Sequence, residues 1–357
     1  MKGGNTGEWS EIYVFLRILA DGGLYAADEN LNKVRDMFLP IIRVFREEEK
    51  GRRYEYRPNS ESAQIEIYQG GKPILEMPSA KFAEEADRLR YSMQRRKKGS
   101  DSFDAAETKT FTRSIYVEKL KARSADKTDI DAGIHDITMK ERSVGFSIKS
   151  ELGSPPTLLN ASLATNFVYK VEGLDPDAAE KINSIDTGGK IKGRIKAIKN
   201  SGGKLVFKGT DNEIFGRNLK LIDRSMSAIL AEMLSGFTSG AAKSCVELSK
   251  YVSSIDPLSE DEEFYVHKIK ELLCAVALGM KPATKWGGRD EANGGYIIVN
   301  KEGDVLVFHI FNRDDFKNYL FNRTKFDTPS SGRHEFGHIY TEDGEMRIKL
   351  NLQIRFV

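Results

Sequence analysis

The stretch DIDAGIHDITMKERSVGFSIKSE, residues 129–151, decides the fold prediction, because apolar side chains recur at every second position on both sides of a short polar segment. These apolar positions are Ile130, Ala132, Ile134, Val144, Phe146 and Ile148. Side chains of a strand point to opposite faces in turn, so the pattern predicts two strands that share an apolar face. The four polar residues 140–143 suit the connection of a hairpin.

The other face of this hairpin carries candidate chemistry. Asp129 and Asp131 share it on the first strand, and Ser147, Lys149 and Glu151 share it on the second. Carboxylates hold Mg²⁺ through oxygen, and a lysine can orient the attacking water or the phosphate in phosphodiester hydrolysis. None of these five residues is a histidine or a cysteine, which argues against zinc. Spacing alone also fits a solvated hairpin, so both interpretations stay open.

Periodicity predicts the other elements. We expect helices at residues 8–19, 32–38, 80–92, 157–164, 174–184, 219–234, 243–252 and 264–278. We expect strands at residues 41–45, 63–67, 205–207, 295–299, 305–311, 336–341 and 346–356, and a polar loop at 99–110. Residues 190–199 are basic and lie in the Gly/Lys-rich stretch between the helices at 174–184 and 219–234, and no internal repeat is visible.

Composition describes a globular protein with two or three packed subregions. The chain has 357 residues, of which 39% are hydrophobic and 30% charged, with a net charge of +2. Cys245 and Cys274 lie in apolar helical segments, so we expect a buried reduced pair and a cytoplasmic location. No apolar run is long enough to span a bilayer and no signal peptide is apparent, so membrane functions are not expected.

Residues 128–149 resemble the PD-(D/E)xK nuclease pattern. Thr128-Asp129 stands for the leading Pro-Asp, and Ser147-Ile148-Lys149 stands for the acid-x-lysine element 18 residues later. Asp131 is the alternative leading acid, whereas Asp136 falls on the opposite face and suits a structural role. Because Ser147 replaces the second acid, the resemblance implies another carboxylate. Glu151 is preferred for its place beyond Lys149, and Glu8 or Glu11 on the first helix could also approach.

Longer segments narrow the resemblance to the HpaII family of type II restriction endonucleases; they are residues 7–13, 24–28, 145–161 and 351–356. The resemblance implies a mixed α/β fold with a PD-(D/E)xK restriction-endonuclease-like core, in which helices flank a central mixed sheet and DNA-recognition subregions are added. It also implies Mg²⁺ as cofactor and cleavage of double-stranded DNA at a short palindromic site, which is CCGG for the family's namesake. A homodimer on that site and a cognate DNA methyltransferase are the expected partners.

Three regions follow from this interpretation. Residues 1–170 would hold the N-terminal helix and the catalytic nuclease core, residues 171–255 a helical and basic subregion, and residues 256–357 a mixed subregion for DNA recognition. Arginine bonded to guanine N7 and O6 is the commonest specific contact in the major groove, so polar residues of the last region are candidates for reading the site. The candidate DNA-binding residues are Asn322, Arg323, Lys325, Arg333 and His334, with Asn160 beside the hairpin.

Plain loop polarity or phosphate contact stays open for each of these candidates. His334 and His338 lack a matching acid or nucleophile, so an acid–base pair is not expected there. Two other functions also stay open. One is a sequence-specific DNA-binding protein without catalysis, and the other is a repair nuclease of the same core that recognises DNA structure.

Overall fold

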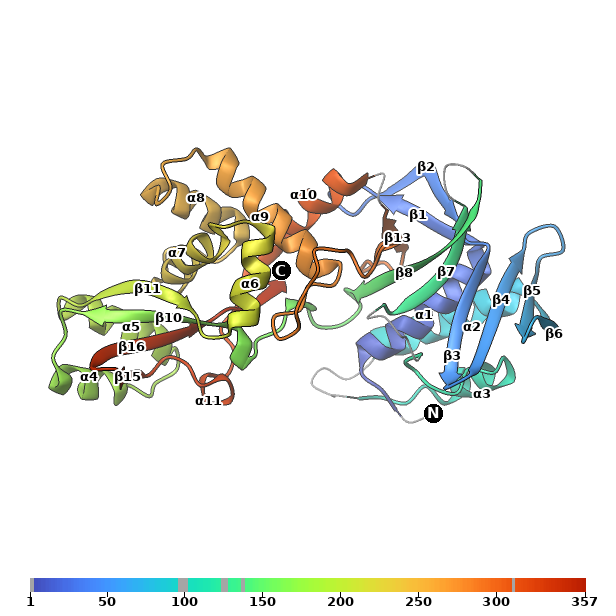
Figure 1. Ribbon diagram of the computed structural model, residues 1–357. Coiled ribbons are helices and arrows are strands. Elements are labelled where there is room, and N and C mark those ends of the chain that lie inside the picture. Colours follow the sequence, from blue (N-terminus) through green and yellow to red (C-terminus); the bar gives the residue numbers. More distant parts are fainter. Residues whose placement is uncertain (1–2, 96–101, 123–127, 136–138, 310–311) are drawn as a thin grey trace. The chain divides into compact units, whose positions relative to one another are not determined.

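The computed structural model describes residues 3–95, 102–122, 128–135, 139–309 and 312–357. The chain divides into two compact units (Figure 1). Unit 1 comprises Met1–Pro156 and Asp290–Tyr319, and unit 2 comprises Thr157–Arg289 and Leu320–Val357. Each unit therefore combines segments that are distant in sequence. The division into three functional regions remains a prediction.

Unit 1 is built on a ten-stranded sheet with the order β2-β1-β13-β12-β8-β7-β3-β4-β5-β6. Its strands are β1 (Gly23–Ala27), β2 (Lys33–Pro40), β3 (Arg43–Glu49), β4 (Arg52–Asn59), β5 (Gln64–Gln69), β6 (Lys72–Pro78), β7 (Ile130–His135), β8 (Glu141–Ser150), β12 (Gly295–Val299) and β13 (Val305–Phe308). The sheet is mixed, because β1 and β13, and likewise β8 and β12, run parallel while the other pairs are antiparallel. The predicted hairpin is confirmed as β7 and β8, but residues 141–143, expected in its connection, belong to β8 and pair with β7.

Helices cover both faces of this sheet. The helices of unit 1 are α1 (Thr6–Asp21), α2 (Ser79–Gln94), α3 (Ala106–Ser114) and most of α10 (Arg313–Arg323). The hydrophobic core that includes Ile12 of α1 takes in Phe146 and Ile297 from one face. Side chains alternate along β12, so Tyr296 points to the other face, where its ring lies 5.0 Å from that of Phe316 of α10. The expected central mixed sheet with flanking helices is confirmed.

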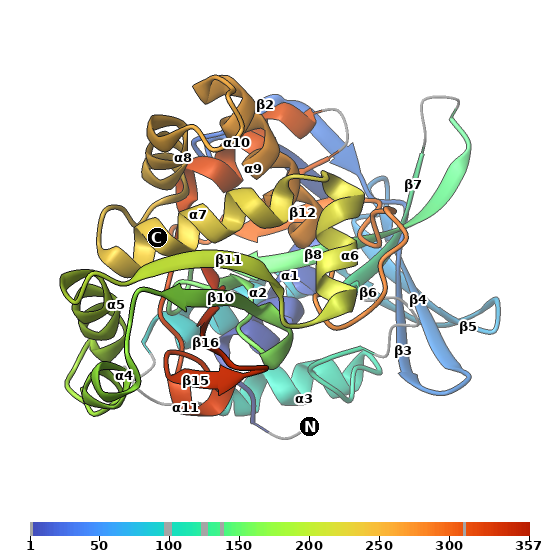
Figure 2. The same cartoon turned by 60° about the vertical axis from the view of Figure 1, so that its left-hand side comes forward.

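Unit 2 contains two smaller sheets, with the orders β11-β10-β16-β15 and β14-β17-β9. Their strands are β9 (Thr157–Leu159), β10 (Asn166–Glu172), β11 (Lys204–Thr210), β14 (Thr324–Phe326), β15 (Ile339–Glu342), β16 (Glu345–Asn351) and β17 (Ile354–Phe356). Its helices are α4 (Pro176–Asn183), α5 (Lys190–Asn200), α6 (Glu213–Ile222), α7 (Met226–Ser239), α8 (Cys245–Ile255), α9 (Glu262–Ala277) and the short α11 (Ser331–His334). Figure 2 shows the larger sheet with α7 running along it. Both cysteines are buried, as expected, and they do not form a disulfide with each other.

Several element predictions are wrong. Residues 32–38 are largely strand β2, because pairing with β1 outweighs their helical spacing. Residues 157–164 begin with β9, which pairs with β17 near the C-terminus, and only a short 3-10 helix (Leu163–Thr165) follows. The single helix expected at 219–234 breaks at Asp223 into α6 and α7. Residues 106–110, taken as loop, belong to α3.

Three predicted features lie partly or wholly outside the described residues. They are Asp136, residues 99–101 of the expected polar loop, and residues 310–311 at the end of the strand expected at 305–311. Among the helices that the structure describes, none is both long and apolar enough to cross a bilayer.

Candidate functional site

The β7–β8 hairpin brings the predicted leading acid to the Ser-x-Lys element. Ile130 pairs with Phe146, so the next position places Asp129 opposite Ser147. The Oδ2 atom of Asp129 accepts a hydrogen bond from the backbone N–H of Ile148 at 2.7 Å, and the Ser147 hydroxyl donates to the same oxygen at 3.5 Å. The Asp129 carboxylate thus extends the hydrogen bonding between the two strands just before the first residue of β7.

Asp131 is held differently, by the residue that stands for the proline of the pattern. The Thr128 hydroxyl donates to Asp131 Oδ1 at 2.7 Å. Thr128 lies directly over Gly145, because a Cβ atom at position 145 would meet the Thr128 Cγ2 atom at 2.2 Å. Glycine at 145 therefore admits the threonine that orients Asp131, and Asp129 is the acid beside Ser147.

Lys149 and Glu151 lie at the end of β8. Lys149 is half-buried, and within the described chain it makes no hydrogen bond or ion pair that would fix its ammonium. The backbone N–H of Glu151 donates to Val299 of β12 at 2.8 Å, and its Oε1 atom accepts from the Tyr319 hydroxyl of α10 at 3.5 Å. Lys149 is free to bind a ligand, whereas Glu151 faces a tyrosine.

The first helix carries two acids, and the structure separates their surroundings. Glu8 belongs to a capping box: its Oε2 atom accepts from the backbone N–H of Asn5 at 2.9 Å, and its own N–H donates to the Asn5 side chain. Its carboxylate thus stabilises the start of α1. The segment that follows β8 also approaches the start of α1, since a Cβ atom at Gly153 would lie 3.1 Å from Thr6 Cγ2.

Glu11, one turn further along α1, is the acid coupled to Asp129. Its side chain is buried, and its Oε2 atom has no hydrogen-bond partner among the described residues. Burial, and then the charge of Asp129, raises the pKa of Glu11 from 4.5 to about 7. Two carboxylates from different elements therefore share one negatively charged region.

Lys121 balances part of this charge. Its Nζ atom lies 3.5 Å from Glu11 Oε1, and the charges of Glu11 and then Asp129 raise the pKa of Lys121. The segment that carries Lys121 is held by Arg46 and Glu48, a buried pair on β3. Glu48 accepts hydrogen bonds from the backbone N–H groups of Glu118 and Lys119, and Arg46 donates to the Lys119 carbonyl. Lys121 was not among the sequence candidates, and no periodicity or motif could have found it.

Tyr296 is a second residue that sequence patterns missed. It is fully buried and pairs in register with Ser147. Its hydroxyl lacks a hydrogen-bond partner among the described residues. Burial, followed by the Tyr319 hydroxyl and the charge of Asp129, raises the pKa of Tyr296 well above its ordinary value. In the sequence it reads as one more apolar position of a buried strand.

The six predicted DNA-binding residues all belong to unit 2 and lie on several of its elements. Asn322 and Arg323 end α10, Lys325 lies in β14, and Arg333 and His334 lie in α11. Arg333, Asn322 and Asn160 are exposed, and the His334 carbonyl accepts a hydrogen bond from the Asn166 side chain. Their contact with DNA stays a prediction.

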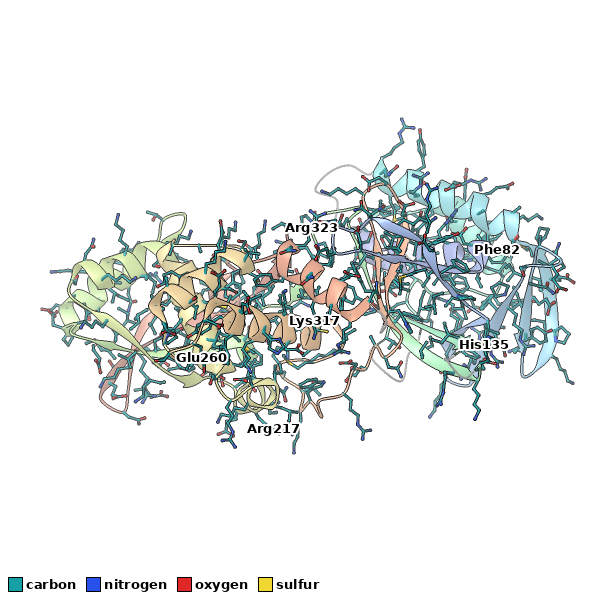
Figure 3. All side chains as sticks on the ribbon, turned by 90° about the horizontal axis from the view of Figure 1, so that it is seen from above. Phe82, His135, Arg217, Glu260, Lys317 and Arg323 are labelled. Carbon is teal, nitrogen blue, oxygen red and sulfur yellow. The ribbon has the colours of Figure 1, made fainter. Side chains whose placement is uncertain are left out.

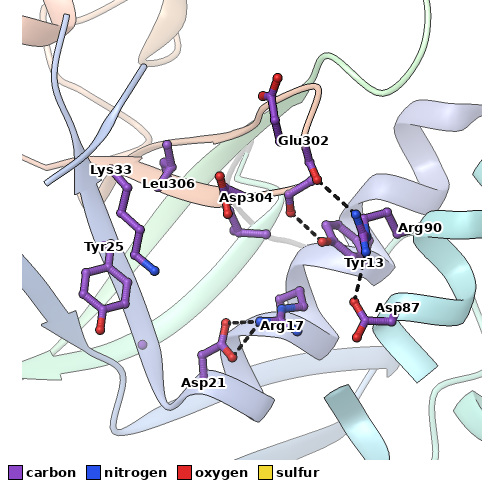
Figure 4. A pocket seen from close by; sticks show the side chains of 13 residues that line it. Tyr13, Arg17, Asp21, Tyr25, Lys33, Asp87, Arg90, Glu302, Asp304 and Leu306 are labelled. Carbon is purple, nitrogen blue, oxygen red and sulfur yellow. Dashed lines mark hydrogen bonds and ion pairs between the residues drawn. The ribbon is translucent and has the colours of Figure 1, made fainter. Parts of the chain in front are cut away.

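A polar pocket occupies the opposite end of α1 (Figure 4). Arg17 donates to both carboxylate oxygens of Asp21 at 2.9 Å, the Tyr13 hydroxyl donates to the Gly303 carbonyl, and Arg90 donates to the Glu302 carbonyl. Ten residues of helix, about 15 Å, separate Asp21 from Glu11. This pocket is therefore distinct from the cluster around Asp129, and its charged groups largely bond to one another.

Across the part of the chain that is described, no three His, Cys, Asp or Glu side chains converge as a ready metal cage. The site instead offers two coupled carboxylates, Asp129 and Glu11, with Glu151 and Asp131 on neighbouring positions. At the end of the same hairpin lies Lys149, which has no ion pair among the described residues. Chemically, such a set can hold a hard cation together with oxygens from a substrate, and can place an ammonium beside a phosphate.

Comparison with known proteins assigns the family. The model of the HpaII restriction endonuclease family matches residues 5–356. The chain is 40% identical over 359 residues to the type II restriction enzyme HpaII of Haemophilus parainfluenzae, in a match that covers 99% of this chain and 98% of that enzyme. No solved structure matches the chain significantly. The chain therefore belongs to the HpaII family of type II restriction endonucleases, which are site-specific deoxyribonucleases.

Proposed function

We propose that this endonuclease cleaves both strands of DNA with Mg²⁺ at a PD-(D/E)xK-type centre formed by Asp129, Glu11 and Lys149. The observation that carries the proposal is the 2.7 Å hydrogen bond from the Ile148 N–H to Asp129, because it joins the leading acid to the Ser147-x-Lys149 element. The electrostatic coupling of Glu11 to Asp129 supplies the carboxylate that Ser147 does not.

The residues fit a magnesium ion. Mg²⁺ prefers oxygen ligands and is held in many nucleotide-processing sites by one or two carboxylates, with water and substrate phosphate completing its shell. Asp129 and Glu11 provide such a pair, and the partnerless Oε2 atom of Glu11 would gain a ligand from a bound cation. When bound, the ion would supply charge stabilisation at the phosphate and acidify a water. Glu151 and Asp131 remain further candidate ligands.

Side chains of the protein have the remaining roles at this centre. The Lys149 ammonium donates to a non-bridging oxygen of the scissile phosphate, or to the attacking water, and opposes the negative charge that builds up during attack. The Ser147 hydroxyl donates to Asp129 and orients its carboxylate. Lys121 favours the ionised form of Glu11. Glu8 acts only through the start of α1.

The family resemblance extends the proposal to the target. We take CCGG as the recognition sequence of this chain and the candidate residues of unit 2, including Arg333 and Lys325, as contacts to that site. A palindrome presents two equivalent half-sites, which a two-fold symmetric homodimer would match. A cognate DNA methyltransferase that modifies the same sequence would protect the host, and the cytoplasm is where both enzymes would meet DNA.

The test is digestion of a plasmid of known sequence with wild-type protein and with the Lys149→Ala variant. Wild-type protein is expected to give discrete fragments ending at CCGG with Mg²⁺ and none with EDTA. The variant should bind the plasmid without cutting it, while Lys50→Ala, in the exposed turn between β3 and β4, should cut normally. Unchanged cleavage by Lys149→Ala would contradict the assignment. Binding without cleavage by wild-type protein would favour a DNA-binding protein, and nicks that follow DNA structure a repair nuclease.

A further inference from the structure

Residues 281–289 of unit 2 form a segment without helix or strand that is fastened to α6 by one buried side chain. Asn218 of α6 is fully buried. Its Nδ2 atom donates to the carbonyls of Lys281 at 3.1 Å and Thr284 at 2.8 Å, and its Oδ1 atom accepts from the backbone N–H of Trp286 at 3.0 Å. A single asparagine therefore fixes three backbone groups of the segment.

Other contacts of α6 complete this attachment. Arg217 donates to the Trp286 carbonyl at 2.7 Å, and the Trp286 indole N–H donates to the Arg289 carbonyl at 2.9 Å. Leu221 packs at Gly288, where a Cβ atom would lie 3.5 Å from the leucine Cδ2 atom. The backbone of the segment is thus ordered against the helix before any partner binds.

The side chains that this arrangement presents are basic. We call the exposed cations of α6 and the segment the α6 platform; they are Arg217, Lys220, Lys281, Lys285 and Arg289. Throughout the described chain none of the five forms an ion pair, although ion pairs are common elsewhere in it. The acid that follows the segment, Asp290, is engaged by Arg313 at 2.9 Å. Figure 3 shows Arg217 at the periphery of unit 2.

The basic stretch at residues 190–199 differs from the platform. It forms α5, where Lys190 pairs with Asp186 at 2.8 Å and Arg194 is buried with its guanidinium bonded to three backbone carbonyls. Lys192 lies over the ring of Phe237. Several cations of α5 therefore serve the fold, whereas those of the α6 platform form no ion pair with any described residue, although the Arg217 guanidinium bonds to the Trp286 carbonyl.

We propose that the α6 platform binds the phosphate backbone of double-stranded DNA. Duplex DNA carries about one negative charge per 1.7 Å of its axis, so it is a partner that several adjacent unpaired cations suit. Because Asn218 has already ordered the segment, little backbone entropy is lost when phosphates bind. The contacts go to the backbone and so position the duplex without reading its sequence. This inference rests on the proposed DNA cleavage and names the surface that holds the substrate.

The test compares two triple variants of the full chain. One, Lys281→Ala/Lys285→Ala/Arg289→Ala, removes three platform cations. The other, Lys50→Ala/Lys181→Ala/Lys250→Ala, removes three exposed lysines elsewhere that also have no ion pair among the described residues. Binding is measured in EDTA, over a range of salt concentrations, to one duplex that contains CCGG and to one that lacks it.

Each phosphate contact contributes about 0.9 to the slope of log affinity against log salt, so the platform variant should lose about 2.7 of that slope. The same relation predicts an affinity loss of up to about 500-fold at 0.1 M salt. Both duplexes should be affected equally, and the control variant should bind like wild-type protein.

The outcomes separate the two proposals. If wild-type protein cuts DNA and the platform variant keeps the wild-type slope, DNA is held elsewhere and the platform assignment is wrong. If the variant weakens only the duplex with CCGG, the platform reads bases, which also overturns a backbone role. If wild-type protein neither binds nor cuts duplex DNA, the proposed function itself fails.

Discussion

Replacing Glu11 by glutamine is expected to stabilise the metal-free protein in a pH-dependent way. Folding raises the pKa of Glu11 from 4.5 to about 7, mainly through burial and then through the charge of Asp129. Ionisation of this group therefore favours the unfolded chain. The penalty is absent below pH 4.5 and complete above pH 7, where about 1.4 kcal/mol per pH unit gives about 3 kcal/mol.

Glutamine has nearly the same shape and carries no charge. The gain in unfolding free energy of Glu11→Gln over wild-type protein should therefore be about 3 kcal/mol at pH 8 and only about 1 kcal/mol at pH 5. The contact with Lys121 lowers the pKa of Glu11 and is therefore already included in the value of about 7. The difference between the two pH values is the quantity that burial of a charge predicts.

The fluorescence of Trp9 allows the unfolding free energy of unit 1 to be measured separately. Trp9 is fully buried, lies two residues from Glu11 and is one of two tryptophans in the chain. In a Trp286→Phe background its fluorescence reports urea unfolding of unit 1, measured in EDTA at both pH values. Ile12→Val is the control, because it removes one buried methylene at a cost of about 1 kcal/mol that should be equal at pH 5 and pH 8. An equal gain for Glu11→Gln at both pH values would refute the reasoning.

Three further predictions follow from the surroundings of Glu11, Gly145 and Asn218. At low Mg²⁺ the initial cleavage rate should rise about tenfold from pH 6 to pH 8 as Glu11 ionises, and a flat profile would argue against Glu11 as a ligand. Gly145→Ala should destabilise the protein by about 1–3 kcal/mol, because its Cβ atom would overlap Thr128. Urea unfolding measures this loss, with Gly153→Ala as the control because a Cβ atom there would meet its nearest neighbour only at 3.1 Å. Asn218→Ala should cost about 2–3 kcal/mol, since it leaves three backbone groups without their partner, whereas the exposed Asn322→Ala should unfold like wild-type protein.

The parts of the fold that sequence predicts are those whose contacts are local. The hairpin follows from alternation within 23 residues, and α1 follows from its own periodicity. The prediction of helix for the residues of β9 is wrong, because their partner, β17, comes from the end of the chain. β1 and β13 likewise pair across most of the sequence. A one-dimensional pattern carries no information on such partners.

The same limit applies to the site. Alternation was sufficient to put Asp129 beside Ser147, but Glu8 and Glu11 lie one turn apart on one helix and periodicity cannot choose between them. A signal did exist, because Asn5 followed three residues later by Glu8 is a capping-box pattern that engages the Glu8 carboxylate. The residues just before Lys121 are held by the buried Arg46 and Glu48 of β3, and only the folded chain brings these segments together.

The serine at position 147 agrees with the charge balance of this site. An acid there would lie about as close to Asp129 as the Ser147 hydroxyl does, at 3.5 Å, beside a glutamate that is already difficult to ionise. Two charges at that distance repel by about 5 kcal/mol at an effective dielectric constant near 20. A hydroxyl avoids this repulsion and donates a hydrogen bond to Asp129. The second carboxylate can then come from α1, where Lys121 offsets part of its charge.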